Sequence, residues 1–433
     1  MKIVIIGAGL TGLYLASMLK KINVDFEIYE KSSRPGGRIK SINIFNTDVE
    51  CGSNIIQPHH FNLINLIKSL KIKSEIINGR KLLSLNDNLS EEKFNKLLTK
   101  ILNIYKQSTP PPSNVSAYIY FQSQLTITEF NFFKSHIFGE ELLQTEISDY
   151  MKYLFYDLKL TNHFKCIGKI PSKFNCTANQ YIKIQQGTQL ITDKLADFVQ
   201  EKLNLNHMVQ EVTYMPLTNS YLLMINDTYI HADKVIIATN ASIQHIRLNL
   251  PKPILKSILN TKSFESMKIF TYHDKSIYEH IKPNDLIQTQ SIFSNICPVS
   301  DNVLSISYIY GSKAELLYNL LSDSNQTTRN KSIQILNKLL ANICGLNLPP
   351  IRDFAFCHWS NGYHINNKPI NTNFWSDYNL ILAGEWIHPY HNTLEGSCLS
   401  AIETFNIISQ PLFIDRLRHK PDNIKSIEAN RHK

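Results

Sequence analysis

The chain has 433 residues, of which 43% are hydrophobic and 19% are charged, and its formal net charge is +9. A chain of this length exceeds a single ordinary hydrophobic core, so we expect two domains. The basic excess comes with no nucleic-acid-binding motif and no stripe of basic and aromatic residues, which excludes nucleic acid from the expected partners.

The chain opens with a strand, a glycine-rich turn and a helix. The β-branched run 3–6 predicts a buried strand, and a G-x-G-x-x-G turn follows it at once. In such a turn the first glycine permits the sharp bend, the second lets a pyrophosphate approach, and the third lets the helix pack on the strand. The helix, about 11–21, directs its free N–H groups at that phosphate. The predicted cofactor contacts here are Gly7, Gly9, Leu10, Thr11 and Gly12.

A second predicted strand, 26–29, ends at an acidic residue. Glu30 follows the strand eighteen residues after Gly12, and Lys31 comes next. A carboxylate at this place accepts hydrogen bonds from both hydroxyls of a ribose and repels a 2′-phosphate. The sequence therefore predicts a dinucleotide other than NADP.

The next segment distinguishes between the remaining dinucleotides. With Gly36, Gly37 and Arg38 the chain resembles the flavin-containing amine oxidase superfamily, which includes monoamine and polyamine oxidases, protoporphyrinogen oxidases and carotene desaturases. The resemblance implies FAD, with the arginine close to its phosphates, where a guanidinium fits well. It also implies an α/β fold: a Rossmann-like FAD/NAD(P)-binding domain assembled from discontinuous segments, with an α+β substrate-binding domain.

The resemblance continues through the middle of the chain. The segment 50–55 is similar to the one that passes the flavin ring, which implies contacts from Gly52, Ser53, Asn54 and Ile55. A helix follows residues 186–188, and its predicted apolar stripe consists of Ile191, Leu195, Phe198 and Val199. Val209 matches the family's valine that meets adenine through its backbone, and 232–239 matches the strand that closes this lobe.

The C-terminal match is the strongest after the first. Residues 379–385 and 393–397 resemble the family's C-terminal flavin signature, and the matching positions are Gly384, Glu385, Thr393, Leu394, Glu395 and Gly396. The resemblance implies that Glu385 meets the ribityl-phosphate region. It also implies that the helix beginning at residues 395–396 faces the flavin pyrimidine, where negative charge collects on reduction.

These matches divide the chain into interleaved domains. We expect an FAD-binding domain from 1–80, 176–250 and 350–412, a substrate-binding domain from 81–175 and 251–349, and a basic tail at 413–433. The substrate part should contain a helix capped by Ser90 and ended by the prolines at 110–112. It should also contain strands at 268–272 and 304–310 and a helix at about 328–343.

The expected chemistry depends on a few residues near the flavin. Lys268 stands where amine oxidases of the family carry a lysine that holds a water against flavin N5; the alternative is a surface lysine at a strand edge. Trp359, Trp386 and His391 are candidates for the substrate pocket. Thr393 replaces the tyrosine of the family's aromatic cage, so the match is incomplete at this place.

The resemblance implies an FAD-dependent amine oxidase that moves a hydride from a substrate C–N bond to flavin N5 and is reoxidised by O2, releasing hydrogen peroxide. The expected partners are a small amine and O2. One alternative is a desaturase or protoporphyrinogen-oxidase-like enzyme acting on a C–C substrate. Another is a flavin-binding protein without oxidase activity. The sequence does not indicate an oligomeric state.

The seven cysteines show no CxxC and no metal-ligand spacing, so we expect reduced thiols and no metal site. No cysteine matches the position that monoamine oxidases attach to FAD, which implies noncovalent FAD. The apolar run 3–6 is too short to span a membrane and leads directly into the glycine turn. We therefore expect a core strand instead of a signal peptide, no transmembrane segment, and a cytoplasmic protein.

Overall fold

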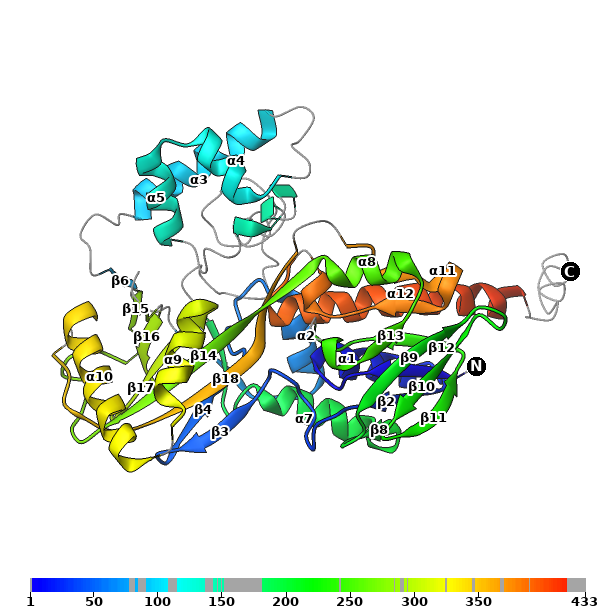
Figure 1. Cartoon of the computed structure of the whole chain (residues 1–433), viewed down its shortest axis with the longest axis horizontal. Coiled ribbons are helices and arrows are strands. Elements are labelled where there is room, and N and C mark those ends of the chain that lie inside the picture. Colours follow the sequence, from blue (N-terminus) through cyan, green and yellow to red (C-terminus); the bar gives the residue numbers. More distant parts are fainter. Residues whose placement is uncertain are drawn as a thin grey trace, which may run out of the picture.

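The structure is a computed structural model that describes residues 2–77, 82–84, 91–107, 115–136, 143–145, 147–148, 150–151, 181–240, 243–283, 285–288, 292–293, 295–323, 325–344, 347–366, 370–388 and 390–418. Within these residues, three larger sheets form the body of the protein, and a group of helices lies beside them (Figure 1).

The first sheet has parallel strands at its centre, in the order β19-β20-β12-β1-β2-β8, with β19 antiparallel at one edge. The carboxyl ends of parallel strands share one edge of a sheet, which is where ligands bind in such folds. The glycine turn after β1, Glu30 after β2 and Gly384 after β20 therefore meet at one edge. The strands are β1 Ile3–Ile6, β2 Phe26–Tyr29, β8 Leu203–Asn204, β12 Lys234–Ile237, β19 Asn373–Phe374 and β20 Leu380–Leu382.

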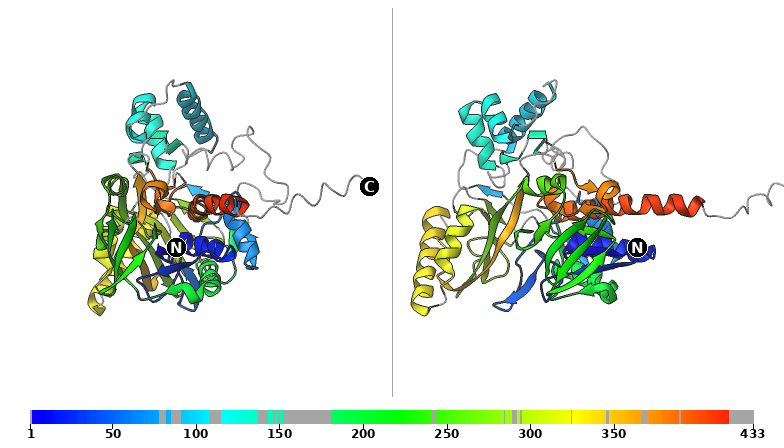
Figure 2. Two further views of the ribbon diagram at one scale, coloured as in Figure 1. Left: turned by 90° about the vertical axis from the view of Figure 1, so that its right-hand side faces the viewer. Right: turned by 45° about the vertical axis from the view of Figure 1, so that its right-hand side comes forward.

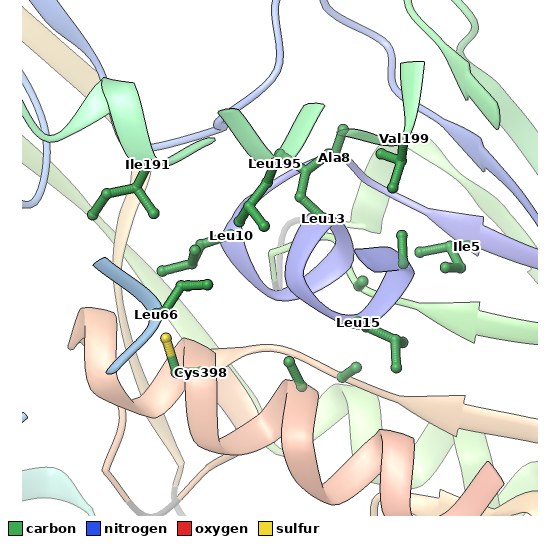
Figure 3. Packing of buried hydrophobic residues seen from close by; sticks show 14 of the residues in the cluster. Ile5, Ala8, Leu10, Leu13, Leu15, Leu66, Ile191, Leu195, Val199 and Cys398 are labelled. Carbon is green, nitrogen blue, oxygen red and sulfur yellow. The ribbon is translucent and has the colours of Figure 1, made fainter. Parts of the chain in front are cut away.

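One face of this sheet is covered by helices from distant parts of the sequence, namely α1 Leu10–Lys21, α2 Phe61–Ser69, α7 Gln189–Phe198 and α12 Leu394–Arg418. Apolar side chains of α1, α2, α7 and α12 pack together in one buried cluster (Figure 3). Ile191, Leu195 and Val199 are buried there as predicted. The prediction is wrong for Phe198, which is 42% exposed and lies under the ammonium of Lys20.

The opposite face is covered by a four-stranded sheet in the order β11-β10-β9-β13. A shared core joins the two sheets and includes Val4, Ile6, Val212 and Leu223. The strands are β9 Val209–Met215, β10 Ser220–Ile225, β11 Thr228–Ala232 and β13 Arg247–Asn249. Short helical elements border them: η2 Gln200–Lys202, η3 Ile243–His245, α8 Lys252–Leu259, α11 Trp375–Tyr378 and η4 Glu385–Ile387.

The remaining six-stranded sheet has the order β18-β14-β17-β16-β15-β6. Its long strands β14 and β18 pair antiparallel along almost their whole length. The strands are β6 Leu82–Ser84, β14 Thr261–His273, β15 Leu286–Gln288, β16 Asn295–Pro298, β17 Val303–Tyr310 and β18 Ile351–Asn366. The helices beside it are α9 Ser312–Leu321 and α10 Gln326–Cys344. The other strands form two antiparallel two-stranded sheets, β3 Ser41–Ile44 with β4 Thr47–Glu50 and β5 Ser74–Ile77 with β7 Tyr181–Ile184.

Three helices, α3 Glu91–Gln107, α4 Ala117–Gln124 and α5 Ile127–His136, form a separate group at the top of Figure 1 and in both views of Figure 2. Their apolar core also takes in Tyr363 and Ile365 from β18, so the group packs against the third sheet. Among the described residues, no helix combines the length and the apolar content needed to cross a membrane.

The structure confirms the predicted elements that it describes. These are the opening strand, turn and helix, the strands at 268–272 and 304–310, and the helix at about 328–343. The Ser90 cap, the prolines at 110–112 and most of the basic tail lie outside the described residues. The domain boundaries stay a prediction; β18 belongs to the third sheet although it falls within the predicted 350–412 segment.

Candidate functional site

Two glycine segments predicted from the sequence lie against each other. The amide of Gly36 donates to the carbonyl of Ala8 at 2.8 Å, and Gly9 forms an isolated parallel bridge with Gly36. A Cβ at Gly12 would lie 2.1 Å from the carbonyl oxygen of Gly7, so helix α1 approaches the turn as closely as a glycine allows. A Cβ at Gly9 would meet nothing within 4 Å. The turn therefore has open space beside its second glycine.

Glu30 is held in place by the same turn. One carboxylate oxygen accepts the amide of Ala8 at 2.9 Å, and the other accepts the amide and the hydroxyl of Ser32 at 2.9 and 2.7 Å. The carboxylate thus lies next to the glycine turn at the edge of the sheet, as the sequence predicts. Lys31 is exposed beside it.

Arg38 and Glu385 form an ion pair that joins the Gly-Gly-Arg segment to the C-terminal signature. Arg38 also donates to the carbonyl of Gly362 at 3.2 Å and contacts His364 Nδ1 at 3.2 Å. Burial would raise the pKa of Glu385, but the charge of Arg38 and the His364 contact hold that pKa well below its usual range. Burial and Arg38 lower the pKa of His364, so its imidazole stays neutral.

The two ends of the sequence are also joined directly. The hydroxyl of Thr11 on α1 donates to the carbonyl of Ser397 on α12 at 3.1 Å. The amide of Asn392 donates to Glu385 at 2.6 Å, and its side chain bonds the backbone of His364 on β18. Thr393 accepts the amide of Gly396 at 2.9 Å, and it therefore caps the start of α12. Thr393, which stands in place of the family's tyrosine, therefore stabilises the start of a helix.

Glu395 is fully buried and lies at the start of a second helix. Its carboxylate accepts the backbone and side-chain N–H groups of Asn62 at 3.0 and 2.7 Å and the amide of Leu63 at 2.8 Å. These groups belong to the first turn of α2, which otherwise has no side-chain cap. Glu395 thus ties α2 to the start of α12.

Lys268 lies on β14, between strands β18 and β17, and its side chain is buried. The alternative of a surface lysine at a strand edge is therefore wrong. Its ammonium donates to the carbonyls of Glu50 and Gly52 at 3.0 and 2.6 Å and to the side chain of Asn54 at 3.1 Å. The structure thus brings Lys268 to the segment 50–55 that is predicted to pass the flavin ring.

A disulfide joins Cys51 of this segment to Cys357 on β18. The expectation of reduced thiols is wrong for this pair, because β18 and the segment 50–55 approach each other only in the folded chain, 306 residues apart in sequence. Cys297 and Cys398 are buried free thiols. The indole N–H of Trp359, a predicted pocket residue, donates to the carbonyl of Cys51 at 3.0 Å.

Other predicted site residues lie around this centre or in the core. Trp386 is predicted to line the substrate pocket, but its side chain is 1% exposed and packs in the core between the first two sheets. Its indole N–H donates to the carbonyl of Ala383, which directs the ring into this core. His391 is buried close to the start of α12.

Among the predicted cofactor residues, the side chains of Leu10 and Leu394 belong to the helical core, and Val209, also buried, begins β9. Ser53 and Ile55 are partly buried.

Several site residues were not predicted from the sequence. Tyr390 bonds both His59 and His60 through its hydroxyl, at 3.0 Å each, and all three side chains are buried. Nδ1 of His60 accepts the amide of Gln57, so a neutral His60 carries its proton on Nε2 and donates to Tyr390, which in turn donates to His59. The sequence signal that could have indicated this cluster was the pair of adjacent histidines, His59 and His60, a few residues after the matched segment 50–55.

The buried histidines predict a pH dependence of stability. Burial lowers the pKa of His59 to about 4, below the value of about 6.5 in an unfolded chain. The unfolded state therefore binds more protons, and stability is complete above about pH 6.5 and is lost as the pH falls towards 4, by about 3 kcal/mol for this group. Urea denaturation at pH 7 and 4.5 should show that the free energy of unfolding falls less between these two pH values in His59→Gln than in the unchanged protein. His280→Gln, at an exposed histidine, should keep the full loss; an equal slope in both variants would contradict the assignment.

The residues at the sheet edge fit a flavin dinucleotide. Gly9 borders open space, Arg38 supplies positive charge, and Glu30 lies where a ribose would be bound. In the part of the chain that the structure describes, the buried Nε2 of His364 has no hydrogen-bond partner, so a polar group can be accommodated there.

Comparisons with known proteins agree with this geometry. A sequence model of the family described as flavin containing amine oxidoreductase matches residues 10–404. A triple mutant of putrescine oxidase is similar in structure, with 15% identity, a TM-score of 0.70, and coverage of 94% of this chain and 98% of that one. Cyclohexylamine oxidase from Brevibacterium oxydans IH-35A has 14% identity, a TM-score of 0.66, and coverage of 95% and 99%. No curated protein matches the sequence. These likenesses confirm the predicted fold class.

Proposed function

Because the chain belongs to the family of flavin-containing amine oxidoreductases, with FAD as its cofactor, we propose that it is an amine oxidase that acts on a small amine and uses O2. The observation that carries this proposal is the burial of Lys268 against the segment 50–55, the place that the family resemblance assigns to the flavin ring. The putrescine oxidase and cyclohexylamine oxidase folds support an amine as the substrate class.

The residues of the chain would hold the cofactor at four places. The turn at Gly7, Gly9 and Gly12 and helix α1 would bind the pyrophosphate, Glu30 would bind the adenosine ribose, and Arg38 with Glu385 would lie along the phosphates and ribityl chain. The start of α12 would direct its positive dipole end at the flavin pyrimidine. Bound noncovalently, FAD would supply the redox chemistry, as the acceptor of the hydride from the C–N bond and the donor of electrons to oxygen, with hydrogen peroxide as the product.

Lys268 would keep its ammonium at the reacting side of the flavin. It is anchored by the carbonyls of Glu50 and Gly52, so its position is fixed before substrate enters. Of its hydrogen bonds to Glu50, Gly52 and Asn54, the longest is the one to Asn54, at 3.1 Å. If a bound ligand displaces Asn54, the freed N–H group of Lys268 can orient a water molecule. The water would then hydrolyse the imine product or assist proton transfer.

Absorbance spectra of the purified protein test the proposal. We expect a flavin spectrum that bleaches under anaerobic conditions when putrescine, cyclohexylamine or another amine is added. Bleaching by a polyene or porphyrinogen panel, with none by any amine, would support the desaturase-like or protoporphyrinogen-oxidase-like alternative instead. A protein that binds flavin and is bleached by neither panel would be a flavin-binding protein without oxidase activity.

Replacing Lys268 by methionine is expected to slow anaerobic flavin reduction or the reaction with oxygen at least about tenfold, because the N–H groups that orient water are lost. Stopped-flow absorbance measures both half-reactions. Lys262→Met is the matched control, since Lys262 is an exposed lysine on the same strand. Equal rates for the two variants would remove Lys268 from the mechanism.

A further inference from the structure

The Cys51–Cys357 disulfide lies among the residues that are assigned to the flavin. Cys51 directly precedes Gly52, and Lys268 stands opposite Cys357 in the paired strands β14 and β18. Trp359 reaches from β18 to the carbonyl of Cys51. We propose that this disulfide is a second redox centre that takes up two electrons from the reduced flavin. This inference rests on the proposed function, because it needs FAD in the predicted place.

A fixed positive charge lies beside the sulfur atoms. Directly opposite residues in an antiparallel pair have Cβ atoms about 4.5–5.5 Å apart, so the side chains of Lys268 and Cys357 share one face of the sheet. The Lys268 ammonium binds the carbonyls of Glu50 and Gly52, on either side of Cys51. A nearby cation stabilises a thiolate and so makes a sulfur a better leaving group when the S–S bond is broken.

The two sulfur atoms stay close to each other without the covalent bond. The amide of Cys51 donates to the carbonyl of Lys40 at 2.8 Å, and the Trp359 and Lys268 hydrogen bonds hold the same segment against β14 and β18. These contacts involve backbone oxygens and do not depend on the redox state of sulfur. The disulfide can therefore open and re-form in place, as a redox centre requires.

The surroundings determine which reductant can reach the pair. Cys51 is 1% exposed, so dissolved thiols such as glutathione cannot reach its sulfur, whereas Cys357 is partly exposed. The flavin would lie next to Gly52, on the buried side of the disulfide. In the proposed step the S–S bond accepts two electrons and two protons and becomes two thiols. The reduced flavin gives up the two electrons with one proton and returns to its oxidised form, and water supplies the second proton.

The test uses light with EDTA as electron donor, which reduces the bound flavin in the holoprotein without any amine substrate. After anaerobic bleaching, the protein is acid-quenched, unfolded and alkylated with iodoacetamide, and modified cysteines are located by mass spectrometry. We expect Cys51 and Cys357 to be alkylated only after bleaching. Flavin-free protein illuminated in the same way should keep both unmodified.

Electron counting gives a second measurement. Full reduction should take about four electrons per flavin in the unchanged protein and about half as many in Cys51→Ser or Cys357→Ser, because the flavin and the disulfide each accept two. Cys297→Ser is the matched control, since Cys297 is a buried free cysteine on β16 of the same sheet, and it should keep the four-electron uptake. If the serine variants do not fold, the alkylation of the unchanged protein still decides.

The outcomes separate this inference from the proposed function. A bleached flavin with both cysteines unmodified would overturn the redox centre and leave the amine oxidase proposal untouched. Alkylation of both cysteines before bleaching would overturn it as well, because no disulfide would then be present. A purified protein with no flavin spectrum would overturn both proposals together.

Discussion

Arg38→Met should lower the free energy of unfolding by about 3–5 kcal/mol, because it leaves the carboxylate of Glu385 buried without its positive partner. In the unchanged protein the pKa of Glu385 is well below its usual range, so the pair contributes stability above about pH 4 that is lost on further acidification. Without the charge of Arg38, the burial of Glu385 should raise its pKa, so the stability lost by the variant should be larger at pH 7.5 than at pH 5. Urea denaturation at pH 5 and 7.5 measures both effects.

The double variant Arg38→Met with Glu385→Gln is the control for this prediction. A neutral glutamine removes the buried charge, so the double variant should recover about half or more of the lost stability, as expected for two residues in direct contact. Recovery would assign the loss to the unpaired carboxylate of Glu385. No recovery would show that the other contacts of Arg38, to Gly362 and His364, account for the loss.

Gly9→Ala and Gly12→Ala should separate cofactor binding from folding. The Gly12 Cβ would collide with the carbonyl of Gly7, a backbone atom that cannot move aside, so we expect a loss of at least about 1–3 kcal/mol in unfolding free energy. The Gly9 Cβ meets open space at an ordinary φ of −75°, so stability should stay within about 0.5 kcal/mol. FAD affinity should nevertheless fall about tenfold or more in Gly9→Ala, since the methyl group takes the place of the pyrophosphate.

Urea denaturation of the flavin-free protein and fluorescence titration with FAD measure these two quantities. Wild-type affinity in Gly9→Ala would remove the open space beside this glycine from the cofactor site. Unchanged stability in Gly12→Ala would show that helix α1 can shift away from the turn.

Local sequence patterns were sufficient to predict the central elements of the fold. The run before Gly7 is apolar at every position and has no alternation, which is typical of a strand covered on both faces, and β1 is buried throughout. Phe198 shows the limit of such patterns. It continues the helical stripe of Ile191 and Leu195, but it lies at the C-terminal end of α7, where the covering elements end.

The site was predictable where a residue acts through its own position in a motif, and not where it acts through a distant partner. Glu30 and Arg38 lie where their motifs place them. The Cys51–Cys357 bond and the pairing of Tyr390 with His59 and His60 depend on contacts between segments more than 300 residues apart, which no local spacing reveals. Trp386 was misjudged because an aromatic residue in a loop can turn into the core as readily as into a pocket.

The hydrogen bond from Thr11 to Ser397 spans 386 positions of sequence, and the Glu395 cap of α2 spans 333. A ribosome releases the chain from its N-terminus, so the glycine turn emerges early while its C-terminal partners do not yet exist. Until α12 leaves the ribosome, α1 and α2 lack the helix that covers them, and their apolar side chains are exposed. The predicted flavin site is therefore complete only after the C-terminal helix has been synthesised, and a truncated translation product would carry the dinucleotide motif without a completed binding site.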